Sequence, residues 1–287
     1  MTNSQTLTGK VPPGPLSGQS ALITGGGSGI GLAIASRLAA DGATVVVAGR
    51  SLDRLRAAAA SLAQGGLHIG TMACDVTDED SVREVCAHTN SLGRFTMCVA
   101  NAGFGSAAPF HLTTLEEWSS VLATNLTGAF LTMKHAVVPM AAAGGGSIVA
   151  VSSIAGHKTH RMMTPYTVSK AGLEMLVQQV ADELGSSGIR ANAVRPGLVP
   201  TDATAGLLGS KEILADYLEQ MPLGRVGSDS EIGELVRFLL GPESSWITGQ
   251  CIGIDGGHTL RRGPNITPLL ESLLGDAIRP AAPPKSV

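Results

Sequence analysis

Short apolar runs alternate along the chain with longer segments in which apolar residues recur every three or four positions. The short runs are apolar almost throughout, which is typical of parallel strands covered on both faces. The pattern predicts strands at residues 20–24, 43–48, 67–73, 95–100, 147–151, 190–194 and 250–254. It predicts helices at residues 29–40, 52–63, 81–91, 115–140, 165–184 and 230–240.

The boundaries of several predicted helices carry residues that favour helix ends. Asp78 and Thr114 stand where N-caps belong, and Gly185 and Gly241 stand where helices should stop. A strand–helix alternation of this length predicts a three-layer, doubly wound α/β fold, in which a parallel seven-stranded sheet carries helices on both faces. We expect one such domain over residues 18–258, after a flexible N-terminal tail of residues 1–17.

Two segments fall outside this alternation. Residues 203–222 interrupt it between the sixth and seventh strands, and residues 259–287 form a C-terminal extension with a short amphipathic piece and a Pro-Ala tail. Ligands bind at the carboxyl edge of such sheets, so residues 203–222 are a candidate substrate lid. A surface loop without a role is the alternative, and the sequence leaves both open.

The composition argues against several classes of protein. Of the 287 residues, 44% are hydrophobic and 15% are charged, which provides for a large core and excludes general disorder. A net charge of −3 without a basic cluster argues against a nucleic-acid partner. The four cysteines form no CxxC pair, which argues against a disulfide framework or a zinc site and favours a reducing compartment.

No segment predicts membrane insertion or export. The best candidate for a membrane helix, residues 121–140, is interrupted by Asn125, Lys134 and His135, so it lacks the roughly 18 uninterrupted apolar residues that a span needs. Residues 1–18 have neither the apolar core nor the cleavage signal of a secretory leader. We therefore expect a cytoplasmic protein.

The first predicted strand leads directly into a glycine-rich turn, and a helix follows. Residues 24–31 read Thr-Gly-Gly-Gly-Ser-Gly-Ile-Gly. Glycines there permit a tight turn, let backbone N–H groups approach a pyrophosphate, and let the helix pack close to the strand. Flexible linkers are glycine-rich too, but this cluster closes the first strand of a strand–helix–strand unit. Its position favours a dinucleotide-binding site.

Several further motifs, taken with this turn, resemble the short-chain dehydrogenase/reductase family in its compact single-domain branch. The matches are TGxxxGxG at residues 24–31, NAG at Asn101-Ala102-Gly103, a helical asparagine at Asn125, Ser153 at 13 residues before Tyr166, YxxxK at Tyr166 and Lys170, and PGxxxT at Pro196-Gly197 and Thr201. They occur in the family's order and cover nearly the whole predicted domain. The resemblance implies a dinucleotide-binding catalytic domain and an oxidoreductase.

The resemblance also implies which residues contact a nicotinamide dinucleotide. They are Gly25, Ser28, Gly29, Ile30, Gly31, Asp75, Val76, Asn101, Ala102, Gly103, Tyr166, Lys170, Pro196, Val199 and Thr201. For Asp75, capping of a turn is the alternative role.

The end of the second strand bears on the choice between NADP and NAD. Enzymes that use NAD tend to place an acidic residue there for the ribose 2′-hydroxyl. Here Gly49 replaces the acid and Arg50 follows, and a guanidinium suits a 2′-phosphate. We expect NADP(H) to be preferred, with NAD(H) as the alternative cofactor, although Arg50 could instead cap a helix or be solvated.

Tyr166 and Lys170 stand four residues apart in a predicted helix and so share one face. A phenol has a pKa of about 10 in water, and a neighbouring ammonium lowers that pKa by favouring the phenolate. We expect Tyr166 to act as general acid in ketone reduction and general base in alcohol oxidation. Ser153 would hydrogen-bond the substrate oxygen, and by resemblance Lys170 also binds the nicotinamide ribose. The resemblance assigns Asn125 to a proton relay, with a buried polar contact as the alternative.

The expected reaction is therefore the interconversion of a secondary alcohol and a ketone on a small molecule. The apolar lid candidates favour a 3-oxoacyl, steroid-like or xenobiotic carbonyl; they are Phe104, Met162, Met163, Leu207, Leu208 and Tyr217. The alternatives are a non-catalytic dinucleotide sensor or scaffold, and a nucleotide-sugar epimerase or dehydratase, for which the chain is short. No metal is expected, because His157 and His160 lack a third ligand. The resemblance implies a homotetramer built on residues 115–140, 165–184 and the last strand.

Overall fold

The computed structural model describes residues 4–5, 14–263 and 266–278. Its centre is a sheet in the order β4-β3-β2-β5-β6-β7-β8, in which every neighbouring pair is parallel. The strands are β2 (Gln19–Thr24), β3 (Thr44–Gly49), β4 (Gly70–Ala73), β5 (Arg94–Ala100), β6 (Gly146–Val151), β7 (Ile189–Pro196) and β8 (Cys251–Ile254). The predicted parallel seven-stranded sheet is confirmed.

An eighth strand, absent from the sequence-based prediction, borders β4. The two residues of β1 (Ser4–Gln5) pair antiparallel with Met72 and Thr71. A two-residue strand carries no periodic pattern, so the sequence gives no signal for it. It falls within the tail expected at residues 1–17, most of which lies outside the described residues.

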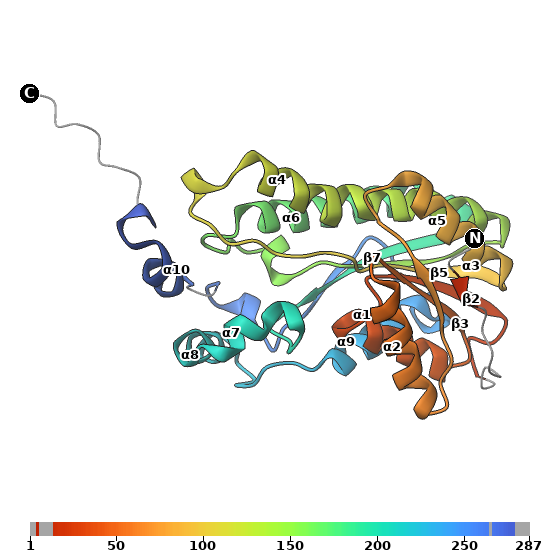
Figure 1. The fold of residues 1–287 in the computed structure, drawn as a ribbon. Coiled ribbons are helices and arrows are strands. Elements are labelled where there is room, and N and C mark those ends of the chain that lie inside the picture. Colours follow the sequence, from red (N-terminus) through yellow and green to blue (C-terminus); the bar gives the residue numbers. More distant parts are fainter. Residues whose placement is uncertain (1–3, 6–13, 264–265, 279–287) are drawn as a thin grey trace, which may run out of the picture.

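Helices cover both faces of the sheet, as expected, and each face has its own apolar core (Figure 1). One core packs the sheet against α1 (Gly29–Ala40), α2 (Leu52–Gln64) and α9 (Asp229–Leu240). The other packs it against α3 (Glu79–Ser91), α5 (Gly128–Ala142) and α6 (Thr164–Leu184). The three-layer doubly wound fold is therefore confirmed, and no described helix is long and apolar enough to cross a membrane.

The helix expected at residues 115–140 is divided. It consists of α4 (Leu115–Leu122), a π-helical turn at Ala123–Thr127, and α5. Two contacts with distant segments accompany the widened turn: Asn125 within it hydrogen-bonds the backbone of Phe104, and α5 begins at Gly128, where a Cβ would lie 2.6 Å from Val76 Cγ2. A 3.6-residue periodicity does not reveal such long-range constraints.

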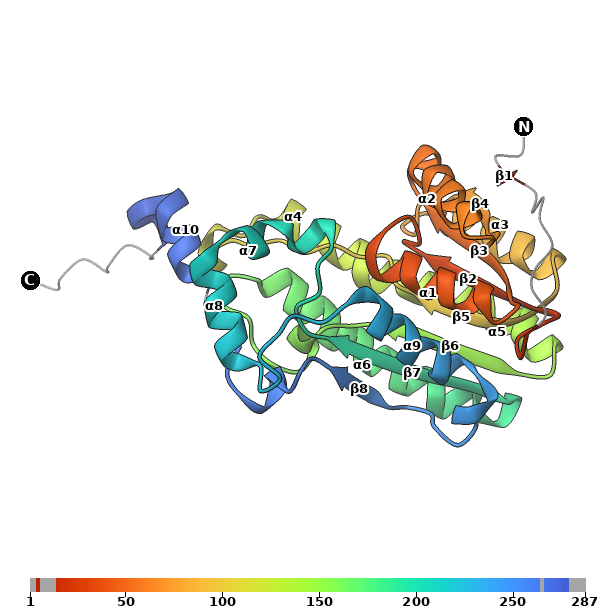
Figure 2. The same cartoon turned by 90° about the horizontal axis from the view of Figure 1, so that it is seen from below.

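The candidate lid segment, residues 203–222, folds into two short helices beyond the sheet. They are α7 (Ala205–Gly209) and α8 (Lys211–Gln220), preceded by a turn at Asp202–Thr204. The extension contributes α10 (Thr267–Leu274), and Figure 2 shows these three helices together at one end of the molecule. A third apolar cluster joins them, with Ile213, Tyr217 and Leu270 among its buried members.

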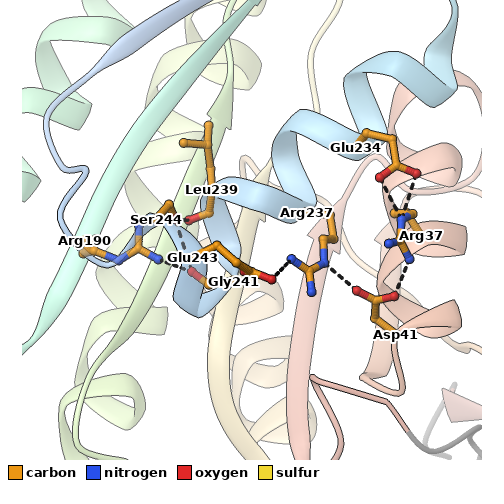
Figure 3. Close-up of polar contacts among 9 residues, drawn as sticks. All are labelled: Arg37, Asp41, Arg190, Glu234, Arg237, Leu239, Gly241, Glu243 and Ser244. Atoms are coloured by element: carbon orange, nitrogen blue, oxygen red, sulfur yellow. Dashed lines mark hydrogen bonds and ion pairs between the residues drawn. The ribbon is translucent and has the colours of Figure 1, made fainter.

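A chain of ion pairs fastens α9 to α1 (Figure 3). The carboxylate of Asp41 accepts hydrogen bonds from Arg37 and Arg237, Arg237 also pairs with Glu243, and Arg37 also pairs with Glu234. Burial alone would raise the pKa of Asp41, but the hydrogen bonds and charges of the two arginines lower it below its ordinary value. The folded state therefore depends on this carboxylate being ionised.

Replacing this carboxylate should destabilise the protein strongly. We expect Asp41→Asn to lower the free energy of unfolding by about 3 kcal/mol, because it removes the buried anion that Arg37 and Arg237 share and leaves Arg237 only the more exposed Glu243. Glu234→Gln is the matched control: its exposed carboxylate pairs with the same Arg37, and its loss should cost under about 1 kcal/mol. Urea denaturation measures both.

The pH dependence provides the second check on Asp41. A lowered native pKa means that the stabilisation is present above the unfolded-state pKa of about 3.9 and is lost as the pH falls through the native pKa. The difference between wild type and Asp41→Asn should therefore shrink below about pH 4. A difference that stays constant down to acid unfolding would contradict the assignment.

Candidate active site

The glycine-rich turn lies between β2 and α1, in close contact with its surroundings. Gly25 has φ +68°, and a Cβ there would lie 2.9 Å from Ala102 Cα. A Cβ on Gly31 would lie 2.4 Å from the Gly25 carbonyl oxygen, so a side chain at this position would force α1 away from the turn. Asn101, at the end of β5, donates Nδ2 hydrogen bonds to the carbonyls of Thr24 (2.9 Å) and Gly25 (3.0 Å).

Two cavities adjoin this turn. The first, of about 590 Å³, lies toward β3 and β4, and the second, of about 420 Å³, lies toward β6, β7 and the α7–α8 segment. The first is lined, among the expected site residues, by Gly25, Ser28, Arg50, Asp75, Val76, Ala102 and Gly103. The second is lined by Gly25, Ser28, Gly29, Ile30, Gly31, Asn101, Gly103, Ser153, Tyr166, Lys170, Pro196, Val199 and Thr201. The structure thus brings every expected site residue except Asn125 to one or both cavities.

The arrangement fits a dinucleotide. The two cavities share Gly25, Ser28 and Gly103, so they meet over the turn. The turn approaches Ala102 so closely that a side chain at Gly25 would displace it. Such a cradle leaves backbone N–H groups at the start of α1 for a pyrophosphate, with one nucleoside on each side.

Arg50 and Asp75 lie together in the first cavity. The pKa of Asp75 is lowered, chiefly because its Oδ1 accepts hydrogen bonds from the Thr77 backbone N–H (2.9 Å) and hydroxyl (2.8 Å), and in smaller part because of the Arg50 charge. Asp75 therefore caps a turn, which was the alternative role, and lines the cavity as well.

Ser153, Tyr166 and Lys170 converge on the second cavity from two elements. Ser153 is the second residue after the end of β6, and Tyr166 and Lys170 lie one turn apart on α6. Lys170 Nζ is 5.7 Å from the Tyr166 ring centroid and donates a hydrogen bond to the Val151 carbonyl (2.8 Å). Lys170 is 4% exposed, and burial lowers its pKa to about 8, against the opposing charge of Glu174.

The pKa of Tyr166 is raised, contrary to the direction expected from the sequence. Burial is the larger influence, and a hydrogen bond with the Ser153 side chain opposes it. The Lys170 amine donates its hydrogen bond to the Val151 carbonyl, and burial lowers its own pKa as well. Spacing on a helix shows that two side chains are neighbours, but it does not report the loss of water around both.

Asn125 occupies the π-helical turn and is 1% exposed. Its Oδ1 accepts a hydrogen bond from the Phe104 N–H (3.0 Å), and its Nδ2 donates to the Phe104 carbonyl (2.9 Å) and to Ser169 Oγ (3.0 Å). These bonds fix the loop after β5 against α6. The side chain makes the buried polar contact that was the alternative, and a relay role stays a prediction.

Sequence reasoning missed a buried polar group beneath Lys170. Glu174, one turn further along α6, pairs with Arg195 (2.6 Å between Oε2 and the nearer nitrogen) and accepts a hydrogen bond from the Ser152 hydroxyl (2.8 Å). The four-residue spacing between Lys170 and Glu174 places both on one helix face, and this was the signal that the sequence offered. The sequence does not reveal that Arg195, from β7, is the partner of Glu174.

The lid candidates divide into two groups. Phe104, Met163, Leu207 and Tyr217 line the second cavity, whereas Met162 and Leu208 pack into the apolar cluster with α10. His160 lines the same cavity. Across the described ranges, no three His, Cys, Asp or Glu side chains gather as metal ligands do.

A doubly wound sheet with a dinucleotide cradle and a Ser-Tyr-Lys group at its carboxyl edge defines the class of nicotinamide-dependent oxidoreductases. The family comparison agrees: residues 25–259 match the family model described as enoyl-(acyl carrier protein) reductase.

Individual relatives point to the same family. A tropinone reductase homolog from Arabidopsis thaliana is 36% identical over 251 residues, covering 87% of this chain and 94% of its own. The structure of a short-chain type dehydrogenase/reductase from Mycobacterium ulcerans superposes with a TM-score of 0.89 at 38% identity, over 92% of this chain and 98% of that one. A candidate NAD(P)-dependent gluconate 5-dehydrogenase from Beutenbergia cavernae, with NADP bound at low occupancy, superposes with a TM-score of 0.81 at 33% identity, over 86% and 100% of the two chains.

The chain belongs to the short-chain dehydrogenase/reductase family. It is an oxidoreductase that acts on alcohol or ketone groups of a small molecule, and its family binds a nicotinamide dinucleotide.

The buried amine gives a direct prediction. We expect Lys170 to titrate near pH 8 in the protein without cofactor, roughly two units below an exposed lysine at about 10.4. Because the Glu174 charge raises this pKa, Glu174→Gln should move the midpoint to lower pH. Nuclear magnetic resonance of ¹³Cε-labelled lysine measures the midpoint, and the signal is assigned by its loss in Lys170→Ala.

Glu183→Gln is the control for this titration. Glu183 lies further along the same helix in an exposed bond with Gln179, so its replacement should leave the Lys170 midpoint unchanged. A midpoint near that of an exposed lysine, or one insensitive to Glu174→Gln, would contradict the account.

Proposed function

We propose that this protein is an NADP(H)-dependent reductase of apolar ketones, also able to oxidise the corresponding secondary alcohols. The observation that carries the proposal is the convergence of Ser153, Tyr166 and Lys170 on the second cavity, which meets the first cavity, lined by Arg50, over the glycine turn. The three convergent side chains supply proton transfer, and the first cavity supplies a positively charged site for the adenosine end of the cofactor.

The preference for NADP(H) is supported by the chemistry at the end of β3. Gly49 offers no carboxylate to the ribose 2′-hydroxyl, and Arg50 and Arg54 both line the adjoining cavity. Guanidinium groups bind phosphate with paired, charge-assisted hydrogen bonds. The relative from Beutenbergia cavernae that carries NADP supports the same choice.

The proposed mechanism uses the protonated form of Tyr166. Its raised pKa keeps the phenol neutral near pH 7, so it is ready to donate a proton to a ketone oxygen. The Ser153 hydroxyl hydrogen-bonds the same oxygen and stabilises its developing charge. When bound, the reduced nicotinamide supplies the hydride. Lys170 lies behind the phenol, held by the Val151 carbonyl, where it steadies the charge left on the tyrosine oxygen.

The walls of the second cavity support an apolar substrate. Ile154, Met163, Leu198 and Leu207 contribute hydrocarbon, and Phe104 and Tyr217 contribute aromatic rings. His160 lines the same cavity, and burial lowers its pKa, so it is neutral near pH 7. The class of substrate that fits is a carbonyl on a 3-oxoacyl, steroid-like or other hydrophobic carrier.

A panel of carbonyl compounds, assayed with both reduced cofactors, tests the function together with Tyr166→Phe. We expect wild type to reduce hydrophobic ketones with NADPH and to act poorly on small polyols. Tyr166→Phe should lower kcat by about 10²–10⁴-fold on every accepted ketone, because the proton donor is lost, while the dissociation constant for NADPH stays within a few fold.

Tyr217→Phe is the matched control, since Tyr217 is the other tyrosine of the chain and lines the same cavity. We expect it to change KM more than kcat. Full turnover by Tyr166→Phe would overturn the proton-transfer assignment, and best activity on hydrophilic polyols would overturn the substrate class.

We further propose a homotetramer that uses the layer of α4, α5 and α6. Large apolar side chains remain exposed on all three helices, including Leu115, Phe130 and Met175, and Trp246 before β8 is almost fully exposed. Exposed large apolar side chains on one layer of helices are typical of subunit interfaces. The family resemblance points to the same helices and the last strand.

Light scattering after size-exclusion chromatography tests the assembly. We expect a wild-type mass near four times 29.2 kDa and a smaller species for Met175→Glu, because a charge at this exposed position opposes burial in an interface. Met175→Leu, which keeps the apolar surface, should assemble as wild type does. A monomeric wild type, or an undisturbed Met175→Glu assembly, would contradict the proposal.

A further inference from the structure

Arg54 is a charged residue of the site that the sequence motifs do not single out. It lies in the first turn of α2 and lines both cavities. Its guanidinium donates a hydrogen bond to Ser28 Oγ (2.8 Å), in the glycine turn, and forms an ion pair with Asp202. It is thus placed beside the turn without belonging to the turn's sequence.

The partner of Arg54 comes from the other side of the site. Asp202 opens the turn that leads into α7, and it lies 148 residues away in sequence. The Arg54 side chain is 52% exposed and that of Asp202 is 77% exposed. Exposed ion pairs of this kind contribute little to stability, so a stronger anion can replace the carboxylate.

The surroundings of Arg54 suit a phosphate group. Of the residues that line the first cavity, Arg50 and Arg54 carry positive charge and Asp75 carries negative charge. The Asp75 carboxylate is engaged by Thr77. A phosphate accepts two parallel hydrogen bonds from a guanidinium, whereas a lysine would offer a single point charge.

We propose that Arg54 is a second determinant of NADP(H) specificity, which binds the 2′-phosphate together with Arg50 and exchanges Asp202 for it. The inference rests on the proposed use of NADP(H). Asp202 acts as a competing anion: its carboxylate pairs with the Arg54 guanidinium until the 2′-phosphate displaces it. Arg54 thereby connects recognition of the adenosine end of the cofactor to the segment that leads into α7.

Calorimetric titration of four probes tests this assignment independently of turnover. The probes are NADPH, NADH, adenosine 2′,5′-bisphosphate and ADP. Arg54→Gln should weaken binding of NADPH and of adenosine 2′,5′-bisphosphate by about tenfold, and should leave NADH and ADP within about twofold of wild type. Arg54→Lys keeps the charge but not the paired donors. Its affinities for NADPH and adenosine 2′,5′-bisphosphate should therefore lie between those of wild type and Arg54→Gln.

Arg56→Gln is the matched control. Arg56 is two residues further along α2, similarly exposed, paired weakly with Asp53 at 3.9 Å, and does not line either cavity. Its replacement should leave all four affinities unchanged. Circular dichroism and thermal unfolding of each variant report whether the fold is kept.

Asp202→Asn tests the exchange. With Arg54 present, we expect it to tighten NADPH binding several-fold, because the competing carboxylate is gone. In the Arg54→Gln background the same change should have no effect on NADPH affinity, since the two residues act through one contact. Additive effects in this double-mutant cycle would overturn the exchange.

The outcomes separate this inference from the proposed function. A wild type that binds NADPH no better than NADH would overturn both the NADP(H) preference and the role of Arg54. A wild-type preference that Arg54→Gln retains would overturn the role of Arg54 alone. Equal losses for NADPH and NADH would assign Arg54 to the pyrophosphate instead of the 2′-phosphate, and would equally overturn the inference.

Discussion

The contact between the glycine turn and the end of β5 is the constraint on which the site depends. Gly25 and Gly31 bring α1 against the turn more closely than any Cβ permits, and Asn101 ties the turn to β5 through two carbonyls. This contact fixes the start of α1 between two cavities. A side chain at either glycine would push α1 away from the strand, and the two cavities of the dinucleotide site would no longer meet over the turn.

The chemistry on the cavity wall depends on burial as much as on charge. The Lys170 amine lies 5.7 Å from the Tyr166 ring centroid, the charge of Glu174 acts on this amine, and Glu174 in turn pairs with Arg195 on β7. Loss of water lowers the pKa of the lysine and raises that of Tyr166. Both shifts disfavour the charged forms, so the phenol keeps its proton near pH 7, while Lys170, with a pKa of about 8, stays mostly protonated there.

The sequence predicted the features that local pattern determines and missed those that depend on contacts between distant segments. Seven parallel strands and the glycine turn follow from apolar runs and from residues 24–31. The π-helical turn around Asn125 does not, because its partner is the backbone of Phe104. The same holds for the pairing of Arg54 with Asp202 and of Glu174 with Arg195. The direction of the Tyr166 pKa shift depends on burial, which spacing alone cannot give.

The C-terminal extension joins two segments that are far apart in the chain. Through α10 it packs on α8, and His111, in the loop after β5, lies with Nε2 3.1 Å from the carbonyl oxygen of Ala277. Leu207 and Tyr217, which line the cavity beside Tyr166, belong to the same apolar cluster as Leu270, so residues that follow the last strand support part of the cavity wall. Substitutions at the end of the chain can reshape which molecules enter without altering a single group that handles hydride or proton, so divergence of substrate range within such enzymes need not touch their chemistry.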